Sequence, residues 1–193
     1  MRKCNDMIKI ITGLRRSGKS YLLNTLFVNH LLEQGVSADC ILQIDLEDAK
    51  NKPLRDPMVM LQYIEERSND NRQYYVILDE VQLMSEFEEI LNTLLKRRKY
   101  DVYVTGSNSR FLVTDVITEF RGRGDEIRIY PLSVAELHEA FPEKSWIDLW
   151  REYSLYGGLP QVVLMTDEAQ KTKYLKQLFR TTYLKDILDR YRI

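Results

Sequence analysis

One segment of eight residues limits what this chain can fold into more than any other: Gly13-Leu14-Arg15-Arg16-Ser17-Gly18-Lys19-Ser20, which matches the pattern G-x-x-x-x-G-K-S/T in full. Its two glycines allow backbone angles that other residues avoid, so the loop can close round an anion with its N–H groups pointing inward. Lys19 is then placed to reach the β- and γ-phosphates of a nucleotide, and Ser20 to coordinate Mg²⁺. Together with the next residue, Tyr21, the segment predicts a binding site for a nucleoside triphosphate.

The residues on either side of this segment favour a strand, a loop and a helix in that order. Residues 7–12 form a short apolar run typical of a buried strand, and apolar residues recur at helical spacing over 21–32, before Gly35. The helix would point the positive end of its dipole at the bound phosphates. A glycine-rich turn without a ligand is the alternative, and this order of elements argues against it.

Strands and helices alternate through the first two thirds of the chain. Further strands are predicted over 40–46, 74–78, 102–105 and 127–130, and further helices over 56–67 and 87–95. This alternation predicts an α/β fold, with a parallel sheet covered on both faces and ligands at the carboxyl ends of the strands. From Ser133 onward the pattern predicts only helices, over 133–140, 146–153 and 167–191, with a tight turn over 156–160. We therefore expect a core in residues 1–131 and a helical lid in 132–193.

An acidic pair, Asp79-Glu80, ends the most apolar of the predicted strands. Carboxylates are costly at the tip of a buried strand unless a cation or a polar ligand uses them. Asp79 fits a magnesium-binding carboxylate, and Glu80 is placed to orient or deprotonate an attacking water. The alternative is that the pair only caps the next helix.

Three further residues are candidates for the chemistry of the γ-phosphate. Asn108 follows the predicted strand 102–105 and is our candidate for a polar sensor, with Ser107 and Thr105 as alternatives and a simple turn residue as the other interpretation. Arg121 or Arg123 fits an arginine finger, which can accelerate phosphoryl transfer by about 10³–10⁵ and can act on the nucleotide of a neighbouring subunit. Surface arginines in a glycine-containing turn are the alternative.

Composition excludes several other classes of function. The longest apolar runs fall far short of the ~20 residues that span a bilayer, and the two cysteines give no disulfide framework, so we expect a cytoplasmic protein without a membrane role. The formal net charge of −1 gives no overall attraction to nucleic acid. The one local candidate for DNA contact is the basic segment 96–99, whose alternative interpretation is the solvated end of a helix. The two histidines show no zinc-binding spacing.

These motifs, in this order, resemble the AAA-type P-loop ATPases of bacteria and archaea, in particular the family whose ATPase domain is usually followed by a nuclease-like domain of unknown function. The further motifs that carry the resemblance are Leu78-Asp79-Glu80-Val81-Gln82, Thr105-Gly106-Ser107-Asn108-Ser109, Arg121-Gly122-Arg123, Pro131-Leu132-Ser133, Tyr156-Gly157-Gly158-Leu159-Pro160 and Tyr183-Leu184-Lys185-Asp186-Ile187. The resemblance implies a P-loop NTPase three-layer sandwich with strand order 5-1-4-3-2, and ATP binding and hydrolysis. The usual C-terminal domain has no counterpart in these residues.

Three functions remain open from the sequence. The first is Mg²⁺-dependent hydrolysis of ATP to ADP and phosphate, and the second is a nucleotide-dependent switch that controls an attached effector domain, a protein partner or a homo-oligomer. The third is motor or loader work on DNA through the basic segment 96–99. Guanine nucleotides are disfavoured because Leu54 stands where the guanine-binding pattern N-K-x-D needs aspartate. The last residues, 189–193, carry no helix-stopping Gly or Pro, which suggests a piece of a longer protein.

Overall fold

The computed structural model of the chain describes residues 7–106 and 123–183. Its strands are β1 Ile8–Gly13, β2 Ile41–Asp45, β3 Tyr74–Asp79, β4 Tyr100–Thr105 and β5 Gly124–Ile129. Its α-helices are α1 Lys19–Tyr21, α2 Val28–Glu33, α3 Pro57–Arg67, α4 Phe87–Lys96, α6 Val134–Ala140, α7 Trp146–Tyr156, α8 Pro160–Val163 and α9 Glu168–Leu178. Within these described residues, two segments are π-helical, Leu22–Phe27 and Phe179–Tyr183, and three are 3₁₀-helical, Ala38–Cys40, Ala49–Arg55 and Val81–Leu83.

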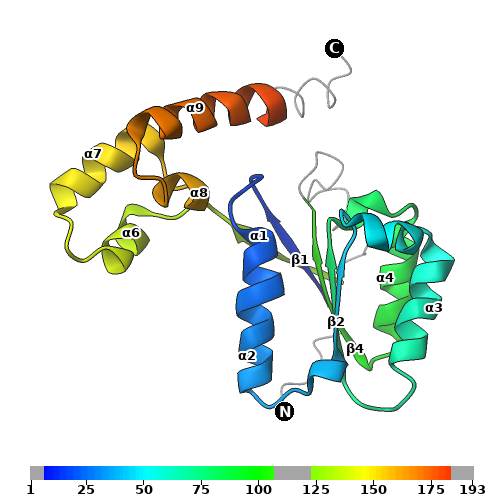
Figure 1. Cartoon of the computed structure of the whole chain (residues 1–193). Helices are drawn as coiled ribbons and strands as arrows, with labels where there is room; N and C mark the ends of the chain where they lie inside the picture. The colour runs from blue at the N-terminus through cyan, green and yellow to red at the C-terminus, as the bar shows by residue number, and fades with distance from the viewer. Residues whose placement is uncertain (1–6, 107–122, 184–193) are drawn as a thin grey trace. The chain divides into compact units, whose positions relative to one another are not determined.

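The five strands form one parallel sheet in the order β2-β3-β4-β1-β5. This is the predicted order 5-1-4-3-2 read from the other edge. Figure 1 shows α1 and α2 on one face of the sheet and α3 and α4 on the other. The structure thus confirms the α/β sandwich with a parallel sheet. Because β3 lies between β2 and β4, Asp79 at its carboxyl end is directly opposite Asp45 and one position beyond the pair Leu78 and Val104.

The chain divides into two compact units: Met1–Thr12 with Lys19–Arg128, and Gly13–Gly18 with Ile129–Ile193. The domain boundary after residue 131 remains a prediction. Within the residues described by the structure, no helix is both long enough and apolar enough to cross a membrane.

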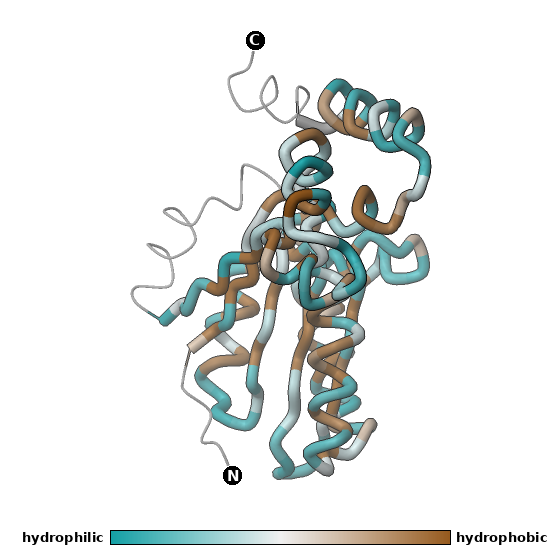
Figure 2. Tube along the Cα trace, turned by 90° about the vertical axis from the view of Figure 1, so that its left-hand side faces the viewer, coloured by the Kyte–Doolittle hydropathy of each residue, from teal (hydrophilic) through white to brown (hydrophobic). Residues whose placement is uncertain are grey.

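The core of the first unit lies between the sheet and the helices α3 and α4. The apolar run in β3 is almost completely buried because a central parallel strand is covered on both faces. α4 turns a continuous apolar stripe toward the sheet, in which Leu91 and Leu94 are fully buried. The hydropathy colouring in Figure 2 shows hydrophobic residues along the strands and hydrophilic residues in the connecting turns.

The helix after the glycine-rich segment is not uniform. It begins as α1, widens into the π-helical segment Leu22–Phe27 and continues as α2. The C=O group of His30 accepts from the N–H of Gln34, and Gly35 with φ +81° ends the helix as predicted. A π-helical turn inside an α-helix is frequently found at functional sites. It places Asn24 one turn after the predicted phosphate-binding residues.

The second unit consists mainly of helices that are fixed by their caps. Ser133 and Glu136 form a capping box at the start of α6, as the sequence predicts. The predicted turn over 156–160 is wrong in part, because Pro160 begins the short helix α8. The last strand also begins earlier than predicted, at Gly124 rather than residue 127. Its alternating exposure, typical of an edge strand, hid its first residues in the sequence pattern.

A close backbone contact joins Leu132, just before α6, to Gly158, just after α7. The N–H of Leu132 donates to the C=O of Gly158 at 2.8 Å, and a Cβ atom on Gly158 would lie only 1.8 Å from the carbonyl oxygen of Leu132. Any side chain at position 158 would collide with backbone. The segment Tyr156–Pro160 therefore needs glycine at 158 for packing.

A nearly buried lysine in α9 is neutralised from α7. The Nζ atom of Lys171, whose side chain is 5% exposed, donates to the Glu152 carboxylate, and Lys144 donates to the same group at 2.9 Å. These ammonium groups, Lys171 first and Lys144 second, hold the pKa of the Glu152 carboxyl below its ordinary value. Lys171 also lies 5.3 Å from the centre of the Tyr156 ring. The ion pair therefore links α7 to α9.

Candidate functional site

The glycine-rich loop uses three left-handed or otherwise unusual backbone conformations. Gly13 has φ +141°, Arg16 has φ +66° and Gly18 has φ +101°. A Cβ atom on Gly13 would lie 2.1 Å from the carbonyl oxygen of Ile129, so only glycine fits there. The N–H of Ser17 closes the turn on the C=O of Leu14 at 3.2 Å. The loop is therefore a tight, preformed turn, consistent with one that presents backbone N–H groups to an anion.

The hydroxyl of Ser17 is buried within this loop. The residue is 5% exposed, and its Oγ atom has no hydrogen-bond partner among the residues that the structure describes. A buried hydroxyl without a partner costs about 1–3 kcal/mol. A bound group with an oxygen acceptor would satisfy it, and this orphan atom favours a ligand at the loop.

The loop leads directly into α1, whose first residues carry the predicted phosphate and metal contacts. Lys19 is 5% exposed, although lysine is seldom buried without an anionic or polar group beside it. Ser20 is exposed, and Tyr21 is 62% exposed. The start of α1 thus offers a buried ammonium group next to an accessible hydroxyl.

Asp79 ends β3 as a buried carboxylate that is 4% exposed. Its Oδ2 atom accepts from Asn24 Nδ2 at 2.9 Å, and its Oδ1 atom accepts from the hydroxyl of Thr105. Both donors are neutral, so the hydrogen bonds orient the carboxylate without neutralising its charge. A divalent cation nearby would be favourable on electrostatic grounds.

Thr105 connects the two acidic residues. It ends β4, is fully buried, and its Oγ1 atom accepts the N–H of Glu80 at 3.0 Å while donating to Asp79. We predicted Thr105 only as an alternative sensor. The structure places it where one hydroxyl fixes the positions of both carboxylate residues.

Glu80 stands in a conformation that is rare for a residue with a side chain. Its φ of +56° and ψ of +49° are left-handed, which costs about 1–3 kcal/mol unless the surroundings impose it. The hydrogen bond to Thr105 and the buried side chain of Val81 hold this turn in place. The Glu80 carboxylate accepts a hydrogen bond from Nε2 of Gln82. Such strained residues cluster at functional sites.

Two residues of this arrangement were absent from the sequence-based candidates. Asn24 is a polar residue inside an apolar helical run, four positions after Ser20, and that position was its signal. Gln82 follows the acidic pair by two residues and had no separate signal. Both depend on partners distant in sequence or on a turn geometry that spacing does not predict.

Among residues 7–106 and 123–183 there is no group of three or more His, Cys, Asp or Glu side chains that could hold a metal ion. Mg²⁺ in nucleotide sites is usually bound through one or two protein oxygen ligands, with phosphates and waters completing its coordination. The accessible hydroxyl of Ser20 and the buried carboxylate of Asp79, both in the first unit, are oxygen ligands of this kind. The residues present therefore fit a nucleotide-bound magnesium ion.

The remaining predicted residues are only partly within the described structure. Asn108 and Arg121 lie outside the described residues. Arg123 is exposed just before β5, and its C=O accepts the N–H of Ile8 at 2.8 Å. The backbone of Arg123 thus extends the pairing of β5 with β1.

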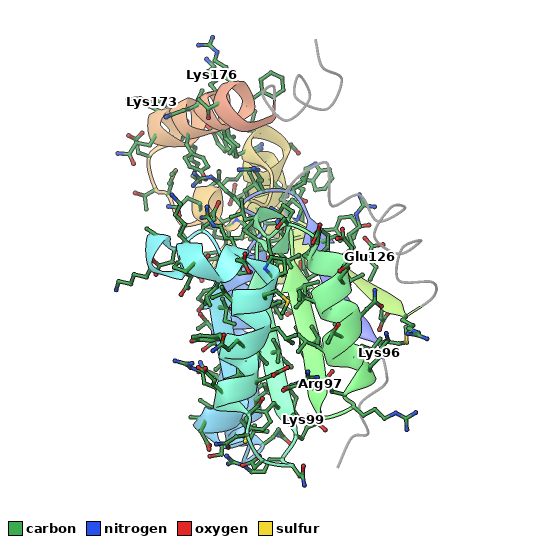
Figure 3. The ribbon with its side chains drawn as sticks, turned by 90° about the vertical axis from the view of Figure 1, so that its right-hand side faces the viewer. Lys96, Arg97, Lys99, Glu126, Lys173 and Lys176 are labelled. Atoms are coloured by element: carbon green, nitrogen blue, oxygen red, sulfur yellow. The ribbon has the colours of Figure 1, made fainter. Side chains whose placement is uncertain are left out.

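Two of the four cations in the basic segment 96–99, Arg97 and Lys99, are engaged within their own unit; both are labelled in Figure 3. Arg97 pairs with Glu65 of α3, and Nζ of Lys99 donates to the C=O groups of Ser68 and, at 3.2 Å, Asp70. The Lys99 ammonium also lies 5.2 Å from the centre of the Tyr100 ring. Two of these four cations therefore stabilise the turn between α4 and β4, which favours the interpretation as a helix end.

Comparisons with known proteins agree with this geometry. A family described as an AAA domain matches residues 5–138. An uncharacterized protein of Haemophilus influenzae is 36% identical to this chain, and the match covers 97% of this chain and 48% of that protein. An uncharacterized protein of Methanocaldococcus jannaschii is 25% identical, and the match covers 97% of this chain and 43% of that protein. The chain thus spans less than half the length of these curated relatives.

Among solved structures, PCH-2 of C. elegans has the same fold, with a TM-score of 0.53 and 17% identity over 76% of this chain and 40% of that one. Because the identity is so low, this match shows a shared fold and nothing more. The match to residues 5–138 covers more than half of the chain, and the predicted resemblance to the AAA class of P-loop proteins is confirmed at this level. The chain belongs to the AAA domain family, which implies that it binds a nucleotide.

Proposed function

We propose that this protein is a magnesium-dependent ATPase that acts in the cytoplasm and hydrolyses ATP to ADP and phosphate. The observation that carries the proposal is the arrangement at the ends of β3 and β4, where the Thr105 hydroxyl contacts both the Asp79 carboxylate and the Glu80 backbone. A site that only binds Mg-nucleotide needs one oriented carboxylate for the metal. A second carboxylate held beside it in a strained turn adds a group that can accept a proton.

The binding residues follow from the motif and its local geometry. The loop Gly13, Leu14, Arg15, Arg16, Ser17 and Gly18 would hold the phosphates, with Lys19, Ser20 and Tyr21 at the start of α1. Ser20 and Asp79 would be the protein ligands of the metal. When bound, Mg²⁺ would neutralise the charge that develops on the β- and γ-phosphate oxygens.

The catalytic residues would act on water and on the transferring phosphoryl group. Glu80 would orient the attacking water and accept its proton, which is the role of a general base. Lys19 would balance charge on the γ-phosphate, and Asn108 would sense that group. Arg121 or Arg123 would supply an arginine finger, which in a homo-oligomer can reach the nucleotide of a neighbouring subunit.

The test separates binding from hydrolysis. Lys19→Ala should abolish the heat of ATP binding measured calorimetrically with Mg²⁺, because it removes the buried ammonium. Glu80→Gln should keep that binding and lower steady-state phosphate release by about 10²–10⁴, the usual effect of removing a general base. Glu139→Gln, an exposed residue of α6, is the matched control and should behave as wild type. Unchanged phosphate release in Glu80→Gln would refute the catalytic assignment.

A second function, a nucleotide-dependent switch, is favoured by contacts of the loop within its own unit. The guanidinium of Arg16 lies over the ring of Tyr174 in α9 at 5.6 Å, and a Cβ atom on Gly18 would lie 3.8 Å from Cγ of Pro160 in α8. A ligand that binds this loop would act directly on α8 and α9. Hydrogen exchange of α9 in the apo, ADP and ATP forms tests this, and identical protection in all three would exclude the switch.

A partner for such a switch would be an effector domain or another protein. The chain covers 48% and 43% of the two relatives described above, so in those proteins a further segment is available for the nucleotide to control. Light scattering with and without ATP would show whether the nucleotide changes assembly of this chain.

A further inference from the structure

We propose that Gln82 is a second water-binding residue of the hydrolytic site. Its NH₂ group holds the Glu80 carboxylate, and its carbonyl oxygen Oε1 accepts a hydrogen bond from the attacking water. This inference rests on the proposed ATPase function and adds a residue that the motif does not assign.

The contact between the two side chains fixes the orientation of the amide. Nε2 of Gln82 donates to Oε2 of Glu80. A carboxylate oxygen can only accept, so the amide nitrogen is the atom that faces it, and Oε1 is left to accept from a different donor. The amide group therefore presents an acceptor next to the carboxylate that would bind the water.

The carbonyl oxygen of this amide lacks a donor. Oε1 of Gln82 is buried and has no hydrogen-bond partner in the described part of the chain. Such an acceptor costs about 1–3 kcal/mol if nothing fills it. One water has two hydrogens, and the Glu80 carboxylate with Gln82 Oε1 supplies two acceptors for them. The donor that we assign to this unsatisfied atom is the attacking water, which would reach Oε1 once the nucleotide is bound.

The turn that carries both residues is rigid, so their spacing is preset. Val81 is fully buried and Met84 is 2% exposed, which anchors the turn in the core. The N–H of Leu83 donates to the C=O of Glu80 at 3.0 Å, and the N–H of Met84 donates to the C=O of Val81 at 3.0 Å. Thr105 holds the Glu80 backbone from β4. Preorganisation of this kind lowers the entropic cost of orienting a reactant.

The hydrolytic step balances with these two acceptors. The water oxygen forms a bond to the γ-phosphorus, and the bond from that phosphorus to the oxygen bridging to the β-phosphate breaks. One water proton passes to the Glu80 carboxylate and later to solvent. The other hydrogen, which points at Gln82 Oε1, stays on the product phosphate, and ADP leaves with the electron pair of the broken bond.

The test compares two glutamines that make the same type of contact. Gln62 in α3 donates through Nε2 to Oε1 of Glu66 at 2.8 Å on the exposed surface, so Gln62→Ala is the matched control for Gln82→Ala. Gln82→Ala should lower kcat for ATP by about 10- to 100-fold, less than loss of a general base. The dissociation constant for Mg-ATP should stay within about twofold, since the contact acts on water and not on the nucleotide.

A double substitution distinguishes this role from a structural one. In a Glu80→Gln background, Gln82→Ala should cause little further loss of kcat, because residues that act as one unit are strongly non-additive. If Gln82→Ala impairs folding, Gln82→Met keeps the length of the side chain without its polar atoms and should show the same loss of kcat.

Two results would overturn the role of Gln82: a kcat in the Gln82 variants equal to that of Gln62→Ala, or a loss in the Glu80→Gln background as large as in wild type. Both presuppose a wild-type protein that hydrolyses ATP. A wild type with no turnover at all would instead refute the proposed ATPase function, and with it this inference.

Discussion

Replacement of Thr105 with valine should destabilise the first unit, because one buried hydroxyl serves two acidic residues. In the wild type, the Thr105 hydroxyl donates to the Asp79 carboxylate and accepts from the N–H of Glu80 at 3.0 Å. Valine has nearly the same shape, but it can make neither hydrogen bond. A hydrogen bond to a charged group contributes about 1.5–3 kcal/mol and a neutral one about 1 kcal/mol. The expected loss in the free energy of unfolding is therefore about 3 kcal/mol.

The loss can be measured in the unit where it arises. For a chain of 193 residues, a loss of this size lowers Tm by about 6–12 °C. Circular dichroism in the far ultraviolet follows both units, whereas tryptophan fluorescence follows only the second, because both tryptophans, Trp146 and Trp150, lie in α7. Thr105→Val should lower the temperature of the main circular dichroism transition. Mg-ATP binding should weaken as well, since Asp79, which we propose as a metal ligand, loses a partner.

Two further variants make this prediction specific. Thr93→Val in α4 removes an exposed hydroxyl that donates to the C=O of its own helix at Glu89, 2.8 Å away, and should cost little. Thr105→Ser restores the hydroxyl and should recover most of the stability. The reasoning is refuted if Thr105→Val unfolds within about 0.5 kcal/mol of Thr93→Val, the usual range for surface substitutions.

Two further predictions concern the second unit, and tryptophan fluorescence during urea unfolding checks both. Gly158→Ala should cost about 3 kcal/mol or more, because its methyl carbon would lie 1.8 Å from the carbonyl oxygen of Leu132. Gly157→Ala has open space around it, but its backbone, at φ +69° and ψ −167°, lies in a region adopted almost only by glycine, so it should cost about 1–3 kcal/mol. Equal costs at the two positions would contradict the close backbone contact. Glu152→Gln should cost about 2 kcal/mol at neutral pH, less than a fully buried pair, because it leaves Lys171 without its counter-ion. Since the folded pKa of Glu152 is lowered, this stabilisation is present above about pH 4.5 and is lost as the pH falls through the folded pKa, so wild type and variant should converge in acid. A difference that is independent of pH would show that the charge of Glu152 is not responsible.

The sequence was sufficient where local pattern decides structure. The apolar run that became β3 and the capping box of Ser133 with Glu136 both follow from neighbouring residues, and both are confirmed. The strand order came from the family resemblance and is confirmed as well. The two glycines of the segment Gly13–Gly18 were expected to take unusual backbone angles, and Gly13 and Gly18 do.

The rest depends on contacts that no local pattern encodes. Asn24 reaches Asp79 across 55 positions in sequence, and Thr105 reaches it across 26. The role of Gln82 depends on the left-handed turn at Glu80, which spacing alone does not predict. The α8 helix was missed because four residues are too few for a helical period to show. The contacts that the residues would make with metal and nucleotide also depend on the folded arrangement, and they remain predictions.

The sheet ends in two outer strands, and their residues bear on how the molecule avoids aggregation. β2 is only five residues long, and β5 carries the charged residues Asp125, Glu126 and Arg128. Short length and charge both discourage a second chain from adding a strand to an open edge, which is the first step toward fibril-like association. The strands with the most buried residues, β1, β3 and β4, are protected from such pairing by their interior places in the sheet order.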